Sequence, residues 1–173
     1  MKKLTMKLIE SAEARLGVPL DYAKKIAATK TSLFLRYARI FRFLNPNKNV
    51  PPLAYHCARI RGALSADCGT CVQAELNLAE QASIADDLRT AILQGRYGEL
   101  PKEIAAVARL ADAVTSQRMD CPEARADVVQ AYGEAGLIEL SFAMNGAALL
   151  PGIKRAMGFA TSCDIDAMQK IAS

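Results

Sequence analysis

The sequence is poor in several residue types on which common functional sites depend. Its 173 residues include no tryptophan and a single histidine, His56, and only 6% are aromatic. One histidine excludes a histidine-rich metal centre and the HExxH motif of metalloproteases, which needs two. No uncharged run of about 18 apolar residues occurs, which argues against a membrane-spanning helix. No convincing alternation of polar and apolar residues occurs either, so we expect no strands.

What remains is an average composition. Apolar residues make up 51% of the chain and charged residues 23%, as in ordinary globular proteins. This balance excludes intrinsic disorder, collagen-like repeats and a disulfide-dense scaffold. A chain of this length forms one domain that buries enough surface to fold without a metal or disulfide staple.

The net charge of +4 comes mostly from the N-terminal part of the chain. The basic residues there are Lys2, Lys3, Lys7, Lys24, Lys25, Lys30, Arg36, Arg39, Arg42 and Lys48. They form either a weak docking site for an anionic partner or simply the solvated side of helices. We expect neither nucleic acid nor a membrane as partner.

The start of the chain, MKKLTMKLIE, is basic but lacks the continuous apolar segment and cleavage site of a signal peptide. The five cysteines are an odd number. Together these features predict a cytoplasmic protein with reduced thiols.

Apolar residues recur at three- and four-residue steps along the chain, which predicts an all-α fold. A pair of N-terminal helices is expected within residues 1–45, the first ending at Gly17-Val18-Pro19 and the second beginning at Asp21. A helical domain follows over residues 50–173. Its expected helices cover about 52–64, 68–81, 83–94, 101–114, 122–132 and 137–150, the last ended by Pro151-Gly152.

One constellation in this domain suggests chemistry. Cys68 and Cys71 are three residues apart at the start of a predicted helix, so they point the same way and are close enough to form a disulfide. Unpaired N–H groups and the helix dipole stabilise a thiolate at that position. Glu75 lies one turn further on, and hairpin geometry places His56 opposite it. Both side chains would then serve the thiols as a proton relay.

Less reactive interpretations of the same residues remain open. The CxxC pair could be half of a zinc site completed by His56 and Cys57, or inert packing, but no second short-spaced pair of ligands occurs. A thioredoxin fold is disfavoured because no βαβ pattern surrounds the pair. We expect no metal or cofactor. His56 alone could be a structural histidine, and we expect the remaining cysteines, Cys57, Cys121 and Cys163, to be packing residues.

The helix-borne CxxC, followed four residues later by a proton-handling side chain, resembles the carboxymuconolactone decarboxylase-like, AhpD-type alkylhydroperoxidase family. That family's pattern carries an acidic residue twelve positions before the first cysteine and a histidine four after the second. Here His56 and Glu75 occupy those positions, so the pair is present with its members exchanged. The resemblance covers about residues 35–160, including the helix start at Ser83–Asp87.

The resemblance implies an all-helical fold assembled as trimers or hexamers, and disulfide-linked reduction of peroxides. Cys71 would attack the peroxide, Cys68 would resolve the sulfenic acid, and a dithiol or thiol donor would reduce the pair. Helix-dipole reasoning alone favours Cys68 as the more acidic thiol. An ionised Glu75 beside Cys71 would raise the pKa of the thiol. Activity would therefore require a partly protonated Glu75 or a positively charged His56.

A second departure is Thr70, which stands where some family members carry a further histidine. The decarboxylase branch is disfavoured because its members generally lack the redox pair. The sequence thus predicts a thiol-dependent peroxidase or disulfide reductase acting on a small peroxide or disulfide. The alternative is a noncatalytic helical oligomer that binds a partner through its basic N-terminal helices.

Overall fold

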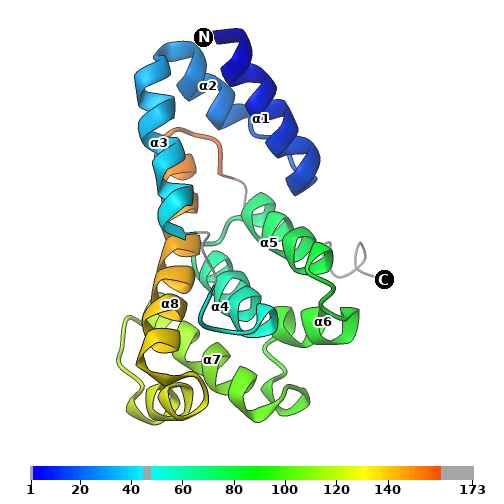
Figure 1. Cartoon of the computed structure of the whole chain (residues 1–173), viewed down its shortest axis with the longest axis vertical. Coiled ribbons are helices and arrows are strands. Elements are labelled where there is room, and N and C mark those ends of the chain that lie inside the picture. The colour runs from blue at the N-terminus through cyan, green and yellow to red at the C-terminus, as the bar shows by residue number, and fades with distance from the viewer. Residues whose placement is uncertain (1, 45–47, 161–173) are drawn as a thin grey trace.

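The computed structural model describes residues 2–44 and 48–160, and within them the fold is all-α with eight α-helices and no strand (Figure 1). The α-helices are α1 (Lys2–Leu16), α2 (Asp21–Thr29), α3 (Thr31–Leu44), α4 (Pro52–Ser65), α5 (Gly69–Gln81), α6 (Asp86–Gln94), α7 (Lys102–Asp112) and α8 (Pro122–Ala156). A 3-10 turn (Tyr97–Glu99) lies between α6 and α7, and a π-helical turn (Ala113–Gln117) lies between α7 and α8. The predicted all-α, single-domain class is confirmed.

Helix α4 is the centre of the main body, with α5, α6, α7 and α8 packed around it (Figure 1). It begins with Pro52, which is tolerated there because the first helical N–H groups have no partner in any case. Small and apolar side chains cover several of its faces, and Ala58 and Ile60 are fully buried. Gly62 lets α8 approach closely, since a Cβ at this position would overlap the Met144 carbonyl oxygen.

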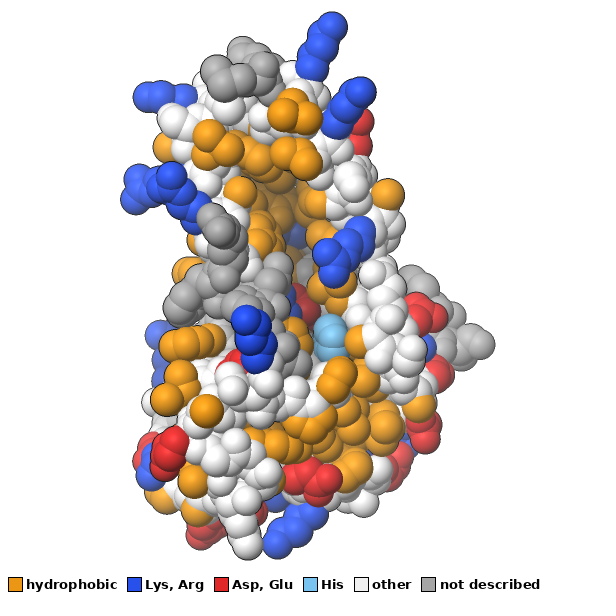
Figure 2. All heavy atoms as spheres, in the orientation of Figure 1, with side chains coloured by type: hydrophobic (Ala, Val, Ile, Leu, Met, Phe, Trp, Pro, Cys, Tyr) orange, Lys and Arg blue, Asp and Glu red, His pale blue; other side chains and the backbone are white. Residues whose placement is uncertain are grey.

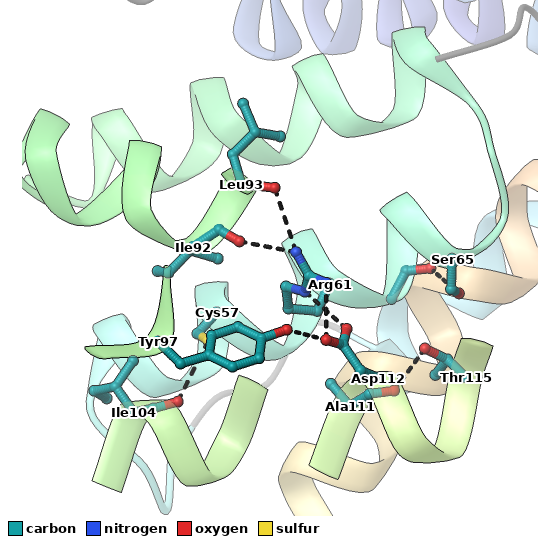
Figure 3. Close-up of polar contacts among 11 residues, drawn as sticks. Cys57, Arg61, Ser65, Ile92, Leu93, Tyr97, Ile104, Ala111, Asp112 and Thr115 are labelled. Carbon is teal, nitrogen blue, oxygen red and sulfur yellow. Dashed lines mark hydrogen bonds and ion pairs between the residues drawn. The ribbon is translucent and has the colours of Figure 1, made fainter. Parts of the chain in front are cut away.

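A polar network ties together helices of the main body (Figure 3). Arg61 of α4 donates two hydrogen bonds of 2.8 Å to the Asp112 carboxylate at the end of α7. The third nitrogen of the Arg61 guanidinium, Nη1, donates to the carbonyl groups of Ile92 and Leu93, near the end of α6. The Tyr97 hydroxyl donates to the same Asp112 carboxylate. One guanidinium thus ties three helices together through a bidentate pair.

The N-terminal segment contains three helices where the sequence predicted two. The long helix expected from Asp21 is interrupted at Lys30, which has an extended backbone (φ −159°, ψ 119°). Its N–H still donates to the Ile26 carbonyl at 3.0 Å, and the Thr29 hydroxyl donates to the Lys25 carbonyl at 2.8 Å. Threonines flank Lys30 on both sides and favour helix poorly, so α2 closes by itself and α3 starts in a new direction.

Helix α1 is held on α5 by two α5 side chains that donate hydrogen bonds to carbonyl groups at its C-terminal end. Asn77 donates to the Leu16 carbonyl at 2.7 Å, and Gln81 donates to the Arg15 carbonyl at 2.6 Å. Both carbonyls lie in the last turn of α1, where no intrahelical partner exists. Gly17 follows with φ +66°, a left-handed conformation that glycine adopts without strain.

Helix α8 differs from its prediction at one of two expected breaks. Gly133 has non-helical angles (φ 69°, ψ 178°), which confirms the expected interruption there. The expected end at Pro151-Gly152 is wrong, because the helix continues to Ala156. A proline inside a helix removes one hydrogen bond and crowds the carbonyl of the preceding turn, so the continuation depends on tertiary contacts. The following turn is anchored by Arg155, which donates to the carbonyl groups of Ala66 and Asp67 at 2.8 and 2.6 Å.

Helix α8 is also long and apolar enough to cross a membrane by length and composition alone. Of its most apolar stretch, 44% is buried within the protein. Core helices of soluble proteins pass the same test, so this feature is weak evidence for a span.

Candidate redox site

A cavity of about 590 Å³ lies between the N-terminal helices and the main body. Figure 2 shows a hollow lined by hydrophobic side chains between the two parts of the molecule. Apolar side chains of α1, α2 and α3 form one wall, and α4, α5 and α8 form the other. A cluster of buried residues that includes Ile9, Tyr22 and Tyr37 holds these walls together.

Cys68 and Cys71 lie at the start of α5, on the body side of the cavity. Cys68 is the N-cap residue and is completely buried, while Cys71 is partly exposed and lines the cavity. The two form a disulfide with a Cα–Cα distance of 5.3 Å. The Cys68 carbonyl accepts the N–H of Cys71 at 2.9 Å as the helix begins. The predicted pair is therefore present at disulfide distance, with one sulfur accessible from the cavity and the other behind it.

Lys154 of α8 brings a positive charge to this pair, and the sequence analysis missed it. Its Nζ atom lies 3.6 Å from Cys68 Sγ and 3.5 Å from Cys71 Sγ, and it donates to the Thr70 hydroxyl at 2.5 Å. The residue is only 6% exposed. Burial lowers the pKa of Lys154, because a low-dielectric environment disfavours the ammonium form.

The N-terminal helices complete the surroundings of Lys154. The Tyr22 ring of α2 lies 5.2 Å from Nζ, in the geometry of a cation–π contact. The hydroxyl groups of Tyr22 and Tyr37 lie 2.7 Å apart, and both rings are buried. Burial raises the pKa of Tyr22, and the hydrogen bond with Tyr37 offsets part of that effect. The tyrosines therefore remain neutral polar neighbours of the lysine.

Glu75 lies in the cavity wall, where Arg59 of α4 holds its carboxylate. Arg59 donates from Nε to Oε2 at 2.7 Å and from Nη2 to Oε1 at 2.6 Å. Both residues are buried, and Arg59 Nη1 also donates to the Tyr55 hydroxyl at 3.3 Å. Burial alone would lower the pKa of Arg59, but the Glu75 carboxylate more than compensates and raises it. The pair is thus a bidentate, charge-assisted contact.

His56 lines the same cavity but does not bind Glu75 through a hydrogen bond among the described contacts. Its buried Nδ1 has no hydrogen-bond partner in the described part of the chain. Its ring packs edge-on against Tyr55, with centroids 5.4 Å apart. Burial lowers the pKa of His56, and the nearby Glu75 carboxylate offsets part of this. Arg59 takes the position expected for His56 because its forked donor matches both carboxylate oxygens.

The other cysteines lie apart from this pair. Cys57 is fully buried and its Sγ donates to the Ile104 carbonyl of α7 at 3.8 Å, while burial raises the pKa of its thiol to about 12. Cys121 is a free thiol at the start of α8. Cys163 lies outside the described residues. Across residues 2–44 and 48–160, no three histidine, cysteine or acidic side chains cluster closely enough to hold a metal ion.

Two residues of the site escaped the sequence analysis for different reasons. Arg59 left a signal, since it is one of two arginines on a helix that is otherwise mostly apolar, and it lies four positions after Tyr55. Lys154 left none, because it follows a proline and a glycine that predicted the end of a helix. Its role depends on α8 continuing past Pro151.

Chemically, the arrangement can support thiol–disulfide exchange. It places one accessible sulfur, one buried sulfur at bonding distance, a cation and a histidine around one cavity. Comparisons with protein-family models, with curated proteins and with solved structures find no match for this chain. The likeness to the AhpD-type family therefore rests on the CxxC motif and the all-helical fold.

Proposed function

We propose that this protein is a thiol-dependent peroxidase or disulfide reductase of the alkylhydroperoxidase type. One observation carries the proposal. Cys71 lines a large cavity while Cys68, at disulfide distance, is buried behind it. A redox pair that attacks a substrate and then resolves itself needs this division between an accessible and a protected sulfur.

The accessibility of the two sulfurs supports Cys71 as the nucleophile. Its thiolate attacks the terminal oxygen of a hydroperoxide, the O–O bond breaks, and the alcohol leaves with one proton while Cys71 becomes a sulfenic acid. Cys68 then attacks the Cys71 sulfur, the S–S bond forms and water leaves. A dithiol donor reduces the disulfide and is itself oxidised, which returns both cysteines to the thiol state. Helix-dipole reasoning favoured Cys68, but a fully buried sulfur cannot meet a substrate first.

Proton transfer is assigned to His56 within this proposal, while Glu75, whose two carboxylate oxygens accept hydrogen bonds from Arg59, is no longer assigned a place in the proton relay. The neutral imidazole of His56 can accept the Cys71 proton and deliver it to the leaving alcohol, since both residues line one cavity. The Arg59 guanidinium balances the charge of Glu75. This balance weakens the repulsion that a lone carboxylate would exert on a thiolate at Cys71. Arg59 thereby takes the place of the protonated Glu75 or charged His56 that the sequence alone required, and the exchanged positions of histidine and glutamate are compatible with activity.

The proposal also names the partners of the reaction. The substrate is a peroxide or disulfide small enough for the cavity, and the reductant is a cellular dithiol or thiol of the cytoplasm. The protein is proposed to work as a homo-oligomer. The N-terminal helices form a wall of the cavity, so they have a role in this function without a separate binding partner.

The test is peroxide consumption with dithiothreitol as the dithiol donor, using hydrogen peroxide and an organic hydroperoxide as probes. We expect Cys71→Ser to abolish consumption, and Cys68→Ser to form no internal disulfide, so that its turnover depends on direct reduction of the Cys71 sulfenic acid by dithiothreitol. Cys121→Ser, which alters a free cysteine outside the cavity wall, is the matched control and should behave as wild type. Equal rates for wild type and Cys71→Ser would refute the proposal.

A further inference from the structure

Among residues 2–44 and 48–160, Lys154 is a buried cation without an anionic partner. None of the ion pairs among the described residues includes it, and the Glu75 carboxylate, which lines the same cavity, is held by Arg59 through both oxygens. Its partners within the described part of the chain are all neutral: the Thr70 hydroxyl, the two sulfurs and the Tyr22 ring. At 6% exposure the side chain does not reach solvent in the way that surface lysines do.

A buried and unpaired lysine with a purely structural role would lower the stability of the fold. Removing an ammonium group from water costs several kcal/mol, and neutral hydrogen-bond partners return only part of that cost. A leucine or methionine would fill the same space without this penalty. The position gains its value only when a negative charge forms beside it, and the two groups nearest to Nζ that can become anions are the sulfurs of Cys68 and Cys71.

We propose that Lys154 is the counter-ion of the reduced pair, and that its ammonium group stabilises the Cys71 thiolate and favours reduction of the disulfide. The inference deepens the proposed function and rests on Cys68 and Cys71 acting as a redox couple. An opposite charge within about 4–6 Å of an acid commonly lowers its pKa by about one to three units. With Nζ at 3.5 Å from Cys71 Sγ, Lys154 meets that condition.

The redox step balances without any group that the proposal does not name. A donor dithiol attacks the disulfide, its own two sulfurs become joined, and two electrons pass to Cys68 and Cys71. Of the two protons released by the donor, one is transferred to Cys68 and the other goes to solvent. Cys71 remains a thiolate beside the Lys154 ammonium. The oxidised protein holds an unpaired cation and the reduced protein a pair, so the ion pair shifts the equilibrium toward the reduced form.

Two neighbours position the ammonium group for this role. Thr70 lies between the two cysteines in the chain and accepts a hydrogen bond from Nζ, and Tyr22 covers Nζ from the N-terminal helices. The start of α5 adds unpaired N–H groups on the same side. The other titratable groups facing this cavity are Arg15, Tyr37, Tyr55, His56, Arg59 and Glu75.

The test measures the acidity and the potential of the pair directly. The pH dependence of Cys71 alkylation by iodoacetamide, followed by peptide mass spectrometry, reports its thiolate fraction. Redox titration of the full chain against dithiothreitol or glutathione reports the potential. We expect Lys154→Met to lower the alkylation rate near neutral pH about tenfold or more. We also expect it to shift the redox equilibrium about tenfold toward the disulfide, which corresponds to about 30 mV.

Three further variants isolate the charge. Lys154→Arg keeps a cation and should retain most of the wild-type acidity. Thr70→Val removes the acceptor that positions Nζ without altering the buried charge, and should give an intermediate loss. Lys102→Met removes an exposed lysine at the start of α7 and should match wild type. Circular dichroism should show that oxidised Lys154→Met folds at least as stably as wild type, because it loses an unpaired buried cation.

The outcomes separate this inference from the function on which it rests. Unchanged acidity and potential in both Lys154→Met and Thr70→Val would overturn the role of Lys154, even if Cys71→Ser abolished peroxide consumption. Conversely, if the protein consumes no peroxide but its Lys154 variants show the expected shifts, the counter-ion role of Lys154 stands and the peroxidase function is refuted.

Discussion

At the scale of single residues, the Arg59–Glu75 pair links the stability of the cavity wall to its chemistry. We expect Glu75→Gln to destabilise the fold by about 3–5 kcal/mol, because it leaves the Arg59 guanidinium buried without an anion. Urea unfolding followed by circular dichroism measures this difference. The matched control is Glu80→Gln, whose side chain is exposed and pairs only loosely with Arg89 at 3.5 Å.

A double variant tests whether that loss comes from the orphaned charge. Replacing the pair by apolar residues, Arg59→Met with Glu75→Leu, should recover most of the stability lost in Glu75→Gln. If Glu75→Gln and Glu80→Gln unfold at the same urea concentration, the pair does not stabilise the wall. Such a comparison also separates loss of folding from a direct effect on the reaction when Glu75 variants are assayed for activity.

The same scale shows what the sequence could and could not predict about the site. Cys68, Cys71 and Glu75 are neighbours along one helix, so the regular geometry of that helix was enough to place them on one side. The partner of Glu75 depended on a competition between His56 and Arg59 across two helices, which spacing alone does not decide. Lys154 reaches the cysteines from 83 residues away, and only tertiary packing brings it there.

At the scale of elements, the crossing of α4 and α8 fixes where Lys154 lies relative to the cysteines. Gly62 permits that close crossing. Gly62→Ala would gain about 1 kcal/mol of helix propensity, but its methyl group would collide with the Met144 backbone. We expect a net loss of about 1–3 kcal/mol in the free energy of unfolding, measured by urea denaturation.

Gly152 provides the matched control for that substitution, because it too lies inside a helix, α8, and an added Cβ would meet nothing within 4 Å. Gly152→Ala should therefore stabilise the protein by up to about 1 kcal/mol. Opposite signs for the two glycines would confirm the close crossing. Equal gains would show that α8 can move away from α4 without cost.

The helix boundaries also show where prediction from the sequence fails. Apolar periodicity placed most of the helices near their observed positions, since amphipathic patterns reflect which face is buried. It failed at Lys30, where two threonines end α2 without a proline or glycine, and at Pro151, where tertiary contacts carry α8 past an expected stop. Both failures lie in elements that build the cavity, which explains why its cysteines were easier to predict than its walls.

At the scale of the whole molecule, exposed apolar side chains on α8 suggest how copies of the chain would associate. Ile138 and Leu149 are 52% and 53% exposed, and they lie eleven residues apart, about three helical turns, on one side of α8. Leu35 of the adjoining α3 is 54% exposed. A recurrent apolar face of this kind is typical of a subunit interface, because burying it against a second copy removes it from water.

We expect wild-type protein to sediment as a homo-oligomer and Ile138→Glu to shift it toward the single chain, since a carboxylate at an apolar interface would be buried without a partner. Sedimentation velocity over a range of protein concentrations measures both.

Leu4→Glu is the matched control, because Leu4 is equally apolar and 66% exposed but lies on α1. That variant should keep the wild-type assembly. Ile138 is exposed within the single chain, so its replacement should leave folding and the Cys68–Cys71 disulfide intact. A wild-type protein that sediments as a single chain at every concentration would mean that this face has another role.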